Sequence, residues 1–378
     1  MRLQDAWINQ PGTQALCASL GLSGYRAYFV GGCVRNALLG EPVLDIDLAT
    51  DARPETVTDI AEMAGFKVIP TGIDHGTVTV IAGGVVHEVT TFRRDVATDG
   101  RRAIVAFSDD IAEDAARRDF TMNALYAEPS GQVIDPLGGI DDLRARRVRF
   151  VGDAQQRIRE DYLRILRFFR LHASYGHPTA GIDADGLAAC AELSAGIATL
   201  SPERIGAEMR KLLAAADPAP ALASMAQAGV LAMVLPGAGS QALARLIHLE
   251  DGVAPRWQRR LAVLGGQADK LRLTRQQATE LGRIRDEIGS VLTAAALGWT
   301  LGEIPALDVM LCRAALLEAA LPPDWQAEVQ RGCQTRFPVT AADLMPDLQG
   351  PELGARLKDL QTRWLASDLT LTRADLLA

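Results

Sequence analysis

The sequence predicts an α+β protein, in which a head of mixed strands and helices precedes an all-helical remainder. Two observations predict this fold class. The first ~150 residues carry short β-rich runs separated by glycine turns. From about Gly152 onward the strand signals nearly vanish, and an Ala-, Leu- and Arg-rich sequence with helical periodicity follows. The length of 378 residues allows two or three domains with a substantial core.

The head opens with a strand, a double-glycine turn, a short helix and a second strand. Residues 28–48 read YFVGGCVRNALLGEPVLDIDL. Glycines let backbone N–H groups approach an anion, and the helix from Val34 directs its positive end towards it. Arg35, one step into this helix, can hold a phosphate through two parallel hydrogen bonds. The segment is neither a Walker loop nor a dinucleotide fingerprint, so the glycine pair alone favours a tight strand–helix turn with a surface arginine.

The second strand carries two acids on either side of an apolar residue. Because strand side chains alternate, Asp45 and Asp47 are expected on one face and Ile46 in the core. Two adjacent carboxylates repel each other, and a bound cation or a shared proton is the usual reason for keeping them. Beside a turn that suits phosphate, the pair favours Mg²⁺-dependent phosphoryl or nucleotidyl transfer. Glu88, in another β-rich run, is either a third acid of this site or a solvated strand residue.

The rest of the head contains further strand signals and one charged segment. Residues 78–81 and 85–92 are β-rich and are joined by a Gly-Gly turn. Residues 93–117 are charged and weakly periodic, so we expect a loop. Four of its arginines either steer a triphosphate or face solvent: Arg93, Arg94, Arg101 and Arg102.

Turn-forming residues interrupt the helical half at four places, and we expect helices to end there. These places are residues 176–178, 217–218, 235–237 and 321–323. A further helix is expected to open at Gly350 and to run towards Trp364. Two short basic clusters, residues 256–260 and 270–275, are either contacts to RNA phosphates or exposed helix faces.

Composition indicates a globular protein of the reducing cytoplasm. No apolar run is long enough to span a bilayer, and the N-terminus lacks a signal-peptide core. The net charge of −8 disfavours broad coating of nucleic acid but allows a local basic groove. The five cysteines are scattered and have neither zinc nor disulfide spacing. They are Cys17, Cys33, Cys190, Cys312 and Cys333.

The double-glycine turn with its acid pair is the first of five ordered segments that resemble one family. The others are RRDFTMNAL (117–125), DPLGGIDDL (135–143), EDYLRILRFFR (160–170) and SPERIGAEMRKL (201–212). Over residues 25–215 the chain is similar to the bacterial class II tRNA nucleotidyltransferase (CCA-adding enzyme) and poly(A) polymerase family. One position departs from the family pattern. Asn36 stands where the family commonly has Asp. Asn keeps a hydrogen-bonding side chain but lacks the negative charge.

This resemblance implies an architecture and an activity. Residues 1–150 would form a nucleotidyltransferase head with a small mixed β-sheet, residues 151–215 a helical neck, and residues 216–378 a helical body and tail that bind tRNA. The implied reaction is Mg²⁺-dependent, template-independent addition or repair of the 3′-terminal CCA of tRNA from CTP and ATP. The alternative is a poly(A) polymerase, or an enzyme that adds only A or only CC. Neither a membrane nor an obligate protein partner is expected.

The resemblance also implies roles for individual residues. Asp45 and Asp47 would hold the metal ions, with Glu88 as the candidate third acid. Asn123 would lie near the sugar or base. The remaining positions implied to contact the nucleotide are Gly32, Arg35, Arg118, Asp161, Arg164, Arg167 and Arg170.

Within this set, the residues matching Asp161 and Arg164 would act as a protein template for the incoming base. Cytosine and adenine both present an amino donor beside a ring-nitrogen acceptor, which an Asp and an Arg can pair. Uracil and guanine present the reverse pattern and would leave buried polar groups unpaired. From the residues alone, the spacing of three through Arg167 and Arg170 also fits an exposed stripe of salt bridges on one helix.

Overall fold

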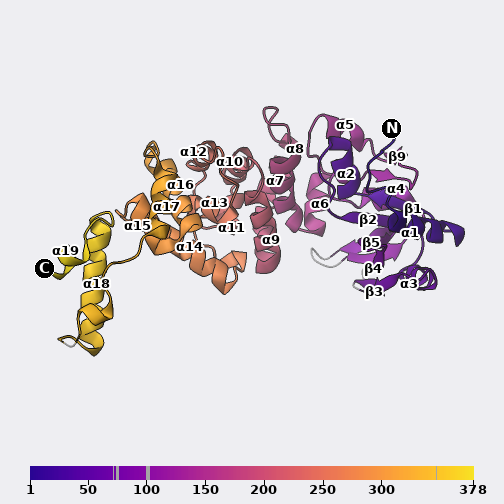
Figure 1. The fold of residues 1–378 in the computed structure, drawn as a ribbon. Coiled ribbons are helices and arrows are strands. Elements are labelled where there is room, and N and C mark those ends of the chain that lie inside the picture. Colours follow the sequence, from indigo (N-terminus) through magenta and orange to yellow (C-terminus); the bar gives the residue numbers. More distant parts are fainter. Residues whose placement is uncertain (71, 74–75, 99–102, 346) are drawn as a thin grey trace. The chain divides into compact units, whose positions relative to one another are not determined.

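The computed structural model describes residues 1–70, 72–73, 76–98, 103–345 and 347–378, and it confirms the α+β prediction (Figure 1). The chain forms two compact units. The first consists of residues 1–201 with 227–233, and the second of residues 202–226 with 234–378. All β-strands of the described chain lie in the first unit, and the second unit is helical.

The head is built on a mixed sheet, which has seven strands in the described part of the chain. Their order is β3-β4-β5-β2-β1-β8-β9. Strand β2 pairs in parallel with β5 and antiparallel with β1, and the other pairs are antiparallel. The acid-bearing strand therefore lies inside the sheet. The bounds are β1 (Ala27–Val30), β2 (Ile46–Thr50), β3 (Lys67–Ile69), β4 (Thr77–Ala82), β5 (Val85–Thr91), β8 (Tyr126–Ala127) and β9 (Val133–Ile134).

Helices α1 and α3 pack against each other and against strands β4 and β5, while α2 packs on β1 and β2. Both α1 and α3 begin with proline at the first turn, where the missing N–H costs no helical hydrogen bond. Val30, Ala49, Phe92 and Tyr126 belong to a buried apolar cluster that includes residues of β1 and β2. The helices of the head are α1 (Pro11–Leu22), α2 (Gly32–Leu39), α3 (Pro54–Met63), α4 (Ile111–Ala116), η2 (Thr121–Asn123) and α5 (Gly139–Arg144).

In the residues that the structure describes, the charged segment 93–117 is mostly strand and helix, so the prediction of a loop was wrong there. Residues Arg93–Thr98 (β6) and Ala103–Phe107 (β7) form a two-stranded antiparallel hairpin, and α4 follows. A hairpin ribbon satisfies its backbone groups by cross-strand pairing and need not bury a whole face, so it leaves little apolar alternation in the sequence. Arg101 and Arg102 lie outside the described residues.

All four predicted interruptions of the helical half fall between helices, which confirms them. The predicted C-terminal helix is α18, and its Trp364 is buried against Trp299 and Phe337. The helices after α5 are α6 (Ala154–Glu160), α7 (Leu163–Tyr175), α8 (Ala184–Glu192), η3 (Ser194–Thr199), α9 (Pro202–Leu213), α10 (Ala219–Gln227), α11 (Val230–Val234), α12 (Leu243–Leu249), α13 (Trp257–Leu264), η4 (Asp269–Leu271), α14 (Arg275–Ile288), α15 (Ala294–Leu301), α16 (Glu303–Leu317), α17 (Trp325–Gln334), η5 (Ala341–Asp343), α18 (Gly350–Ala366) and α19 (Arg373–Leu377).

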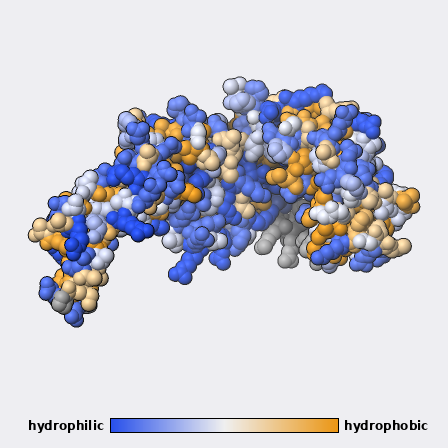
Figure 2. All heavy atoms as spheres, in the orientation of Figure 1, coloured by the Kyte–Doolittle hydropathy of each residue, from blue (hydrophilic) through white to orange (hydrophobic). Residues whose placement is uncertain are grey.

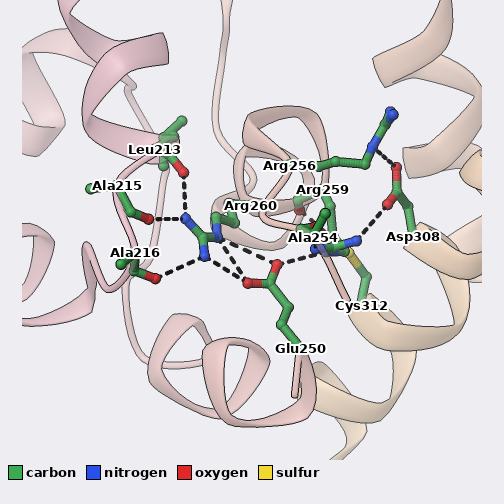
Figure 3. A network of polar contacts seen from close by, with 10 residues as sticks. All are labelled: Leu213, Ala215, Ala216, Glu250, Ala254, Arg256, Arg259, Arg260, Asp308 and Cys312. Carbon is green, nitrogen blue, oxygen red and sulfur yellow. Dashed lines mark hydrogen bonds and ion pairs between the residues drawn. The ribbon is translucent and has the colours of Figure 1, made fainter. Parts of the chain in front are cut away.

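The basic cluster at 256–260 is not an exposed helix face, because two of its arginines are buried in a network of polar contacts (Figure 3). Arg259 and Arg260 are each 1% exposed, and both pair with the carboxylate of Glu250 at 2.6 and 2.7 Å. Arg259 also pairs with Asp308 at 3.0 Å. Arg260 donates to three backbone carbonyls just after α9 and at its end. The cluster therefore joins α13 to its neighbours within the second unit.

Hydrophilic side chains cover most of the face drawn in Figure 2, with apolar side chains interspersed in patches. Among the described helices, none is both long and apolar enough to cross a membrane.

Candidate active site

The double-glycine turn lies between two guanidinium groups. Gly31 has φ 73° and ψ −121°, a backbone conformation that residues with a side chain rarely adopt. A Cβ on Gly31 would lie 3.5 Å from Nη1 of Arg118, and a Cβ on Gly32 would lie 3.7 Å from Nη2 of Arg35. The Gly31 N–H donates to the carbonyl of Leu125 at 3.1 Å, which ties the turn to the 117–125 segment. Glycine is thus needed at Gly31 for its backbone conformation, while both Cβ distances are those of ordinary contact.

Asp47 lies near the two other candidate acids of the head, Asp45 and Glu88. Ile46 is 6% exposed and enters the core, while Asp47 is half-buried and Asp45 is exposed, as alternation requires. In the parallel pairing of β2 with β5, Asp47 lies opposite Glu88. Burial, then the charge of Glu88 and more weakly that of Asp45, raises the pKa of Asp47 to about 6, although Arg118 opposes the shift. The strand begins later than expected, since Leu44 is 88% exposed.

The donor set fits a hard divalent cation that substrate helps to hold. A raised carboxylate pKa reports unfavourable negative charge, which a cation would relieve. No three His, Cys, Asp or Glu side chains of the described residues converge closely enough to hold an ion by themselves. Mg²⁺ is commonly held by one or two carboxylates, with water and substrate phosphates completing its six positions. Asp45 and Asp47 can supply those two carboxylates.

Arg118 is held in place by a partner that sequence reasoning missed. Its Nη2 donates to Asp114 at 2.9 Å and its Nε donates to Tyr126 Oη at 3.0 Å. Tyr126 Oη in turn donates to the same carboxylate at 2.7 Å. Burial opposes ionisation of Asp114, but Arg118 and Arg117 outweigh it and lower the pKa of Asp114 to about 2. The available signal was the spacing of Asp114 from the two arginines, three and four residues on.

Asp119 is the second residue that sequence reasoning did not single out. Its Oδ2 accepts from Arg167 Nε at 2.7 Å, and its Oδ1 accepts from Asn123 Nδ2 at 2.9 Å. The Asn123 side-chain oxygen accepts from Arg35 at 2.5 Å. Against the effect of burial, Arg167 and Asn123 lower the pKa of Asp119 to about 2. A continuous polar chain therefore connects α7 to the helix of the double-glycine turn.

The segment expected to select the base, residues 160–170, is not one helix, and this corrects the sequence expectation. Helix α6 ends at Glu160 and α7 begins at Leu163, while Asp161 has extended backbone between them. Its Oδ1 accepts from the Leu163 N–H at 3.1 Å, and such local bonding competes with a continuing helix. Asp161 therefore does not share a helix with Arg164, Arg167 and Arg170.

The three arginines of α7 have different surroundings. Arg164 Nη1 donates to Glu160 Oε2 at 2.5 Å and to the Arg157 carbonyl at 2.7 Å. Arg167 pairs with Asp119, and the charge of Arg170 acts on Arg35. The structure thus brings Arg167 and Arg170 to the Arg35 side of the site. Arg164 lies at the break between α6 and α7, beside Asp161.

The chain is similar to known proteins over most of its length. Residues 27–149 match the family model described as poly A polymerase head domain, and residues 181–241 match the probable RNA and SrmB-binding site of polymerase A. The CCA-adding enzyme of Geobacillus stearothermophilus is 38% identical over 329 residues, which cover 82% of this chain and 78% of the relative. The chain belongs to the family of CCA-adding enzymes.

A second relative and a solved structure match along nearly the whole chain. CCA tRNA nucleotidyltransferase 1, mitochondrial, of Danio rerio is 32% identical over 370 residues, which cover 92% of this chain and 85% of the relative. The crystal structure of the Bacillus stearothermophilus CCA-adding enzyme in complex with CTP superposes with a TM-score of 0.74 at 33% identity, covering 95% of this chain and 94% of that one. The family's head model spans the glycine turn and all three acids.

Proposed function

We propose that this protein completes or repairs the 3′-terminal CCA of tRNA, using CTP and ATP without a nucleic-acid template. The observation that carries the proposal is the group of three carboxylates, Asp45, Asp47 and Glu88, beside a glycine turn flanked by two arginines. That group lies in a chain of the CCA-adding family, one relative of which was solved in complex with CTP. The 3′-oxygen of the RNA would form a bond to the α-phosphorus, the α–β bridge would break, and pyrophosphate would leave.

Asp45 and Asp47 would hold Mg²⁺, with Glu88 as a third acid near it. When bound, the metal supplies Lewis-acid chemistry: it favours deprotonation of the 3′-hydroxyl and stabilises negative charge on the phosphates. Arg118 and Arg35, on either side of Gly32 and its neighbour Gly31, would bind the triphosphate and sugar. The ion pair with Asp114 holds Arg118 in one orientation for that purpose.

Asp161 and Arg164 would select the base, and Arg167 and Arg170 would contact the nucleotide. An Asp acceptor beside an Arg donor pairs with the amino group and ring nitrogen that C and A share. Glu160 supports this role because it fixes Arg164 at one end of α7. Uracil and guanine would each leave a buried donor or acceptor unpaired, which is strongly unfavourable.

Single-nucleotide incorporation tests the function. The protein is incubated with Mg²⁺ and tRNA that lacks CCA, with CTP, ATP, UTP and GTP supplied singly and then together. We expect two C additions with CTP, one A only after both C residues, and then arrest. Continued addition of A would establish the alternative, a poly(A) polymerase. No incorporation at all would point to a noncatalytic RNA-binding homologue.

The same proposal assigns roles along the chain. Residues 1–150 would be the catalytic head, residues 151–215 the neck that selects the base, and residues 216–378 the body and tail that bind tRNA. Substrate tRNA and both nucleotides are cytoplasmic in bacteria, so we place the protein there.

A further inference from the structure

Arg35 is a buried cation whose hydrogen-bond partners are all neutral. Arg35 is 8% exposed. The guanidinium donates to the side-chain oxygens of Asn36 and Asn123 and to the hydroxyl of Tyr175, whose ring centroid lies 4.0 Å away. Burial lowers the pKa of Arg35, and the nearby charge of Arg170 lowers it further. A buried charge normally acquires an oppositely charged partner.

No carboxylate in the described residues forms an ion pair with Arg35. The charge of Asp119 acts on Arg35, but its two oxygens accept from Arg167 and Asn123. Among the described residues Arg35 therefore has no direct ion-pair partner, and its guanidinium lies beside Gly32 in the glycine turn. An anion bound at that turn would meet this charge at short range and largely shielded from water, where electrostatic attraction is screened less.

Asn36 uses both ends of its amide in this arrangement. Its Oδ1 accepts from Nε and Nη2 of Arg35 at 3.1 and 2.9 Å, and its Nδ2 donates to the Pro42 carbonyl at 2.8 Å. The opposite orientation of the amide would set donors against the guanidinium and an acceptor against the carbonyl, so the contacts determine the assignment. An aspartate at this position would pair with Arg35 ionically and would face the Pro42 carbonyl without a proton to donate.

We propose that Asn36 is a positioning residue that orients Arg35 without neutralising it, so that the nucleotide triphosphate meets its full charge. Asn36 also ties Pro42, in the segment that leads into Asp45, to the same guanidinium. The inference rests on the proposed function and assigns Asn36 to triphosphate affinity. Base selection, which depends on α7, is separate from it.

The test compares Asn36→Asp with Asn36→Ala in the full-length protein. Calorimetric titration with inorganic tripolyphosphate measures anion binding directly, and steady-state kinetics with CTP and ATP give KM and kcat. Asn36→Asp should weaken tripolyphosphate binding about tenfold, because it adds a carboxylate against Arg35. KM for both nucleotides should rise by a similar factor, with kcat and the preference over UTP and GTP unchanged. Asn36→Ala removes the group that orients Arg35 but adds no charge, so tripolyphosphate binding should weaken by about threefold or less.

Arg35→Gln supplies the reference for complete loss of the charge, and it should weaken tripolyphosphate binding at least as much as Asn36→Asp. A folded Asn36→Asp that binds tripolyphosphate like the wild type overturns the proposal. The proposal is also overturned if Asn36→Ala binds tripolyphosphate as weakly as Arg35→Gln does. This second comparison tests the proposal even if Asn36→Asp does not fold. If the wild-type protein adds CCA but the variants do not show the expected tripolyphosphate affinities, only this inference is refuted. Wild-type protein that incorporates no nucleotide would refute the proposed function itself.

Discussion

At the scale of single residues, the electrostatics of the site centre on Asp47. This carboxylate is half-buried in β2, faces Glu88 across a parallel pair, and has Asp45 two residues before it. Its pKa is raised from 3.8 to about 6 by burial first and by these two acids next. The metal-free head therefore carries a destabilising charge at neutral pH. A carboxylate that destabilises the metal-free protein and could bind a cation is a candidate for a functional residue.

Replacing this carboxylate should separate stability from activity. Asp47→Asn removes the repulsion and should raise the free energy of unfolding of the metal-free protein at pH 7 by about 1–2 kcal/mol. The same change should reduce nucleotide transfer by more than about a hundredfold while tRNA binding survives, because a metal ligand is lost. Urea unfolding, a transfer assay and tRNA titration measure the three quantities. Transfer near the wild-type rate would remove Asp47 from the metal site.

The pH dependence follows from the direction of the same shift. Because the folded-state pKa lies above the ordinary value, the folded chain binds this proton more tightly than the unfolded chain does. The contribution of Asp47 to metal-free stability should therefore decline as pH rises from 3.8 to about 6, and remain level above that. Mg²⁺ competes with the proton, so transfer at limiting Mg²⁺ should fall below about pH 6. Saturating Mg²⁺ should move that midpoint to lower pH. A midpoint independent of Mg²⁺ would contradict this.

At the scale of elements, the break between α6 and α7 determines the geometry of the segment for which we propose base selection. Asp161 occupies the extended residue before α7 and accepts from the Leu163 N–H. Arg164 is held from the other side by Glu160, the last residue of α6. Farther along α7, the pair of Arg167 with Asp119 connects the helix to the head. Two arginines near the start of α7 thus attach the helix to two different parts of the first unit.

Asp161 is the residue of this break whose loss should change selectivity. Asp161→Ala removes the acceptor for the amino group of C and A, and discrimination against UTP and GTP should fall about tenfold or more. Competition between CTP and UTP in the tRNA assay measures the ratio of kcat/KM values. Arg356→Ala, which alters an exposed ion pair with Asp359, is a matched control and should leave the ratio unchanged. Unchanged selectivity with an intact rate would disprove the template role.

At the scale of the whole molecule, the two compact units depend on different interactions. The first unit has a mixed sheet with an apolar core, and the second adds a buried ion network to its packed helices. In that network Glu250 pairs with both Arg259 and Arg260, and Arg260 also satisfies carbonyls that α9 leaves unpaired at its end. Removing one member of such a network leaves a buried charge without its partner.

Truncating Arg260 tests the structural role of the network. Arg260→Ala should lower the free energy of unfolding of the second unit by about 3–5 kcal/mol, since Glu250 loses a buried partner and α9 loses its capping donor. CTP binding below the unfolding transition should be unchanged, because Arg260 lies outside the first unit. Arg356→Ala should cost about 1 kcal/mol or less, because its pair is exposed. A loss for Arg260→Ala no larger than this would contradict the buried network.

The sequence by itself determined the features that depend on neighbours along the chain. Proline and glycine groups mark the helix ends, and the Asp45-Ile46-Asp47 alternation places two acids on one side, because both effects act within a few residues. The ordered motifs also identified the family and the fold class. These properties need no knowledge of which segments meet.

Only the tertiary structure decided which distant residues meet. Parallel pairing of β2 with β5 sets Glu88 opposite Asp47, and the docking of α7 brings Arg167 to Asp119. Burial of Arg260 could not be predicted from a basic cluster, because periodicity does not reveal what covers a helix face. The partner of an amide or a charge is set by packing between segments far apart in sequence, and no local pattern encodes that choice.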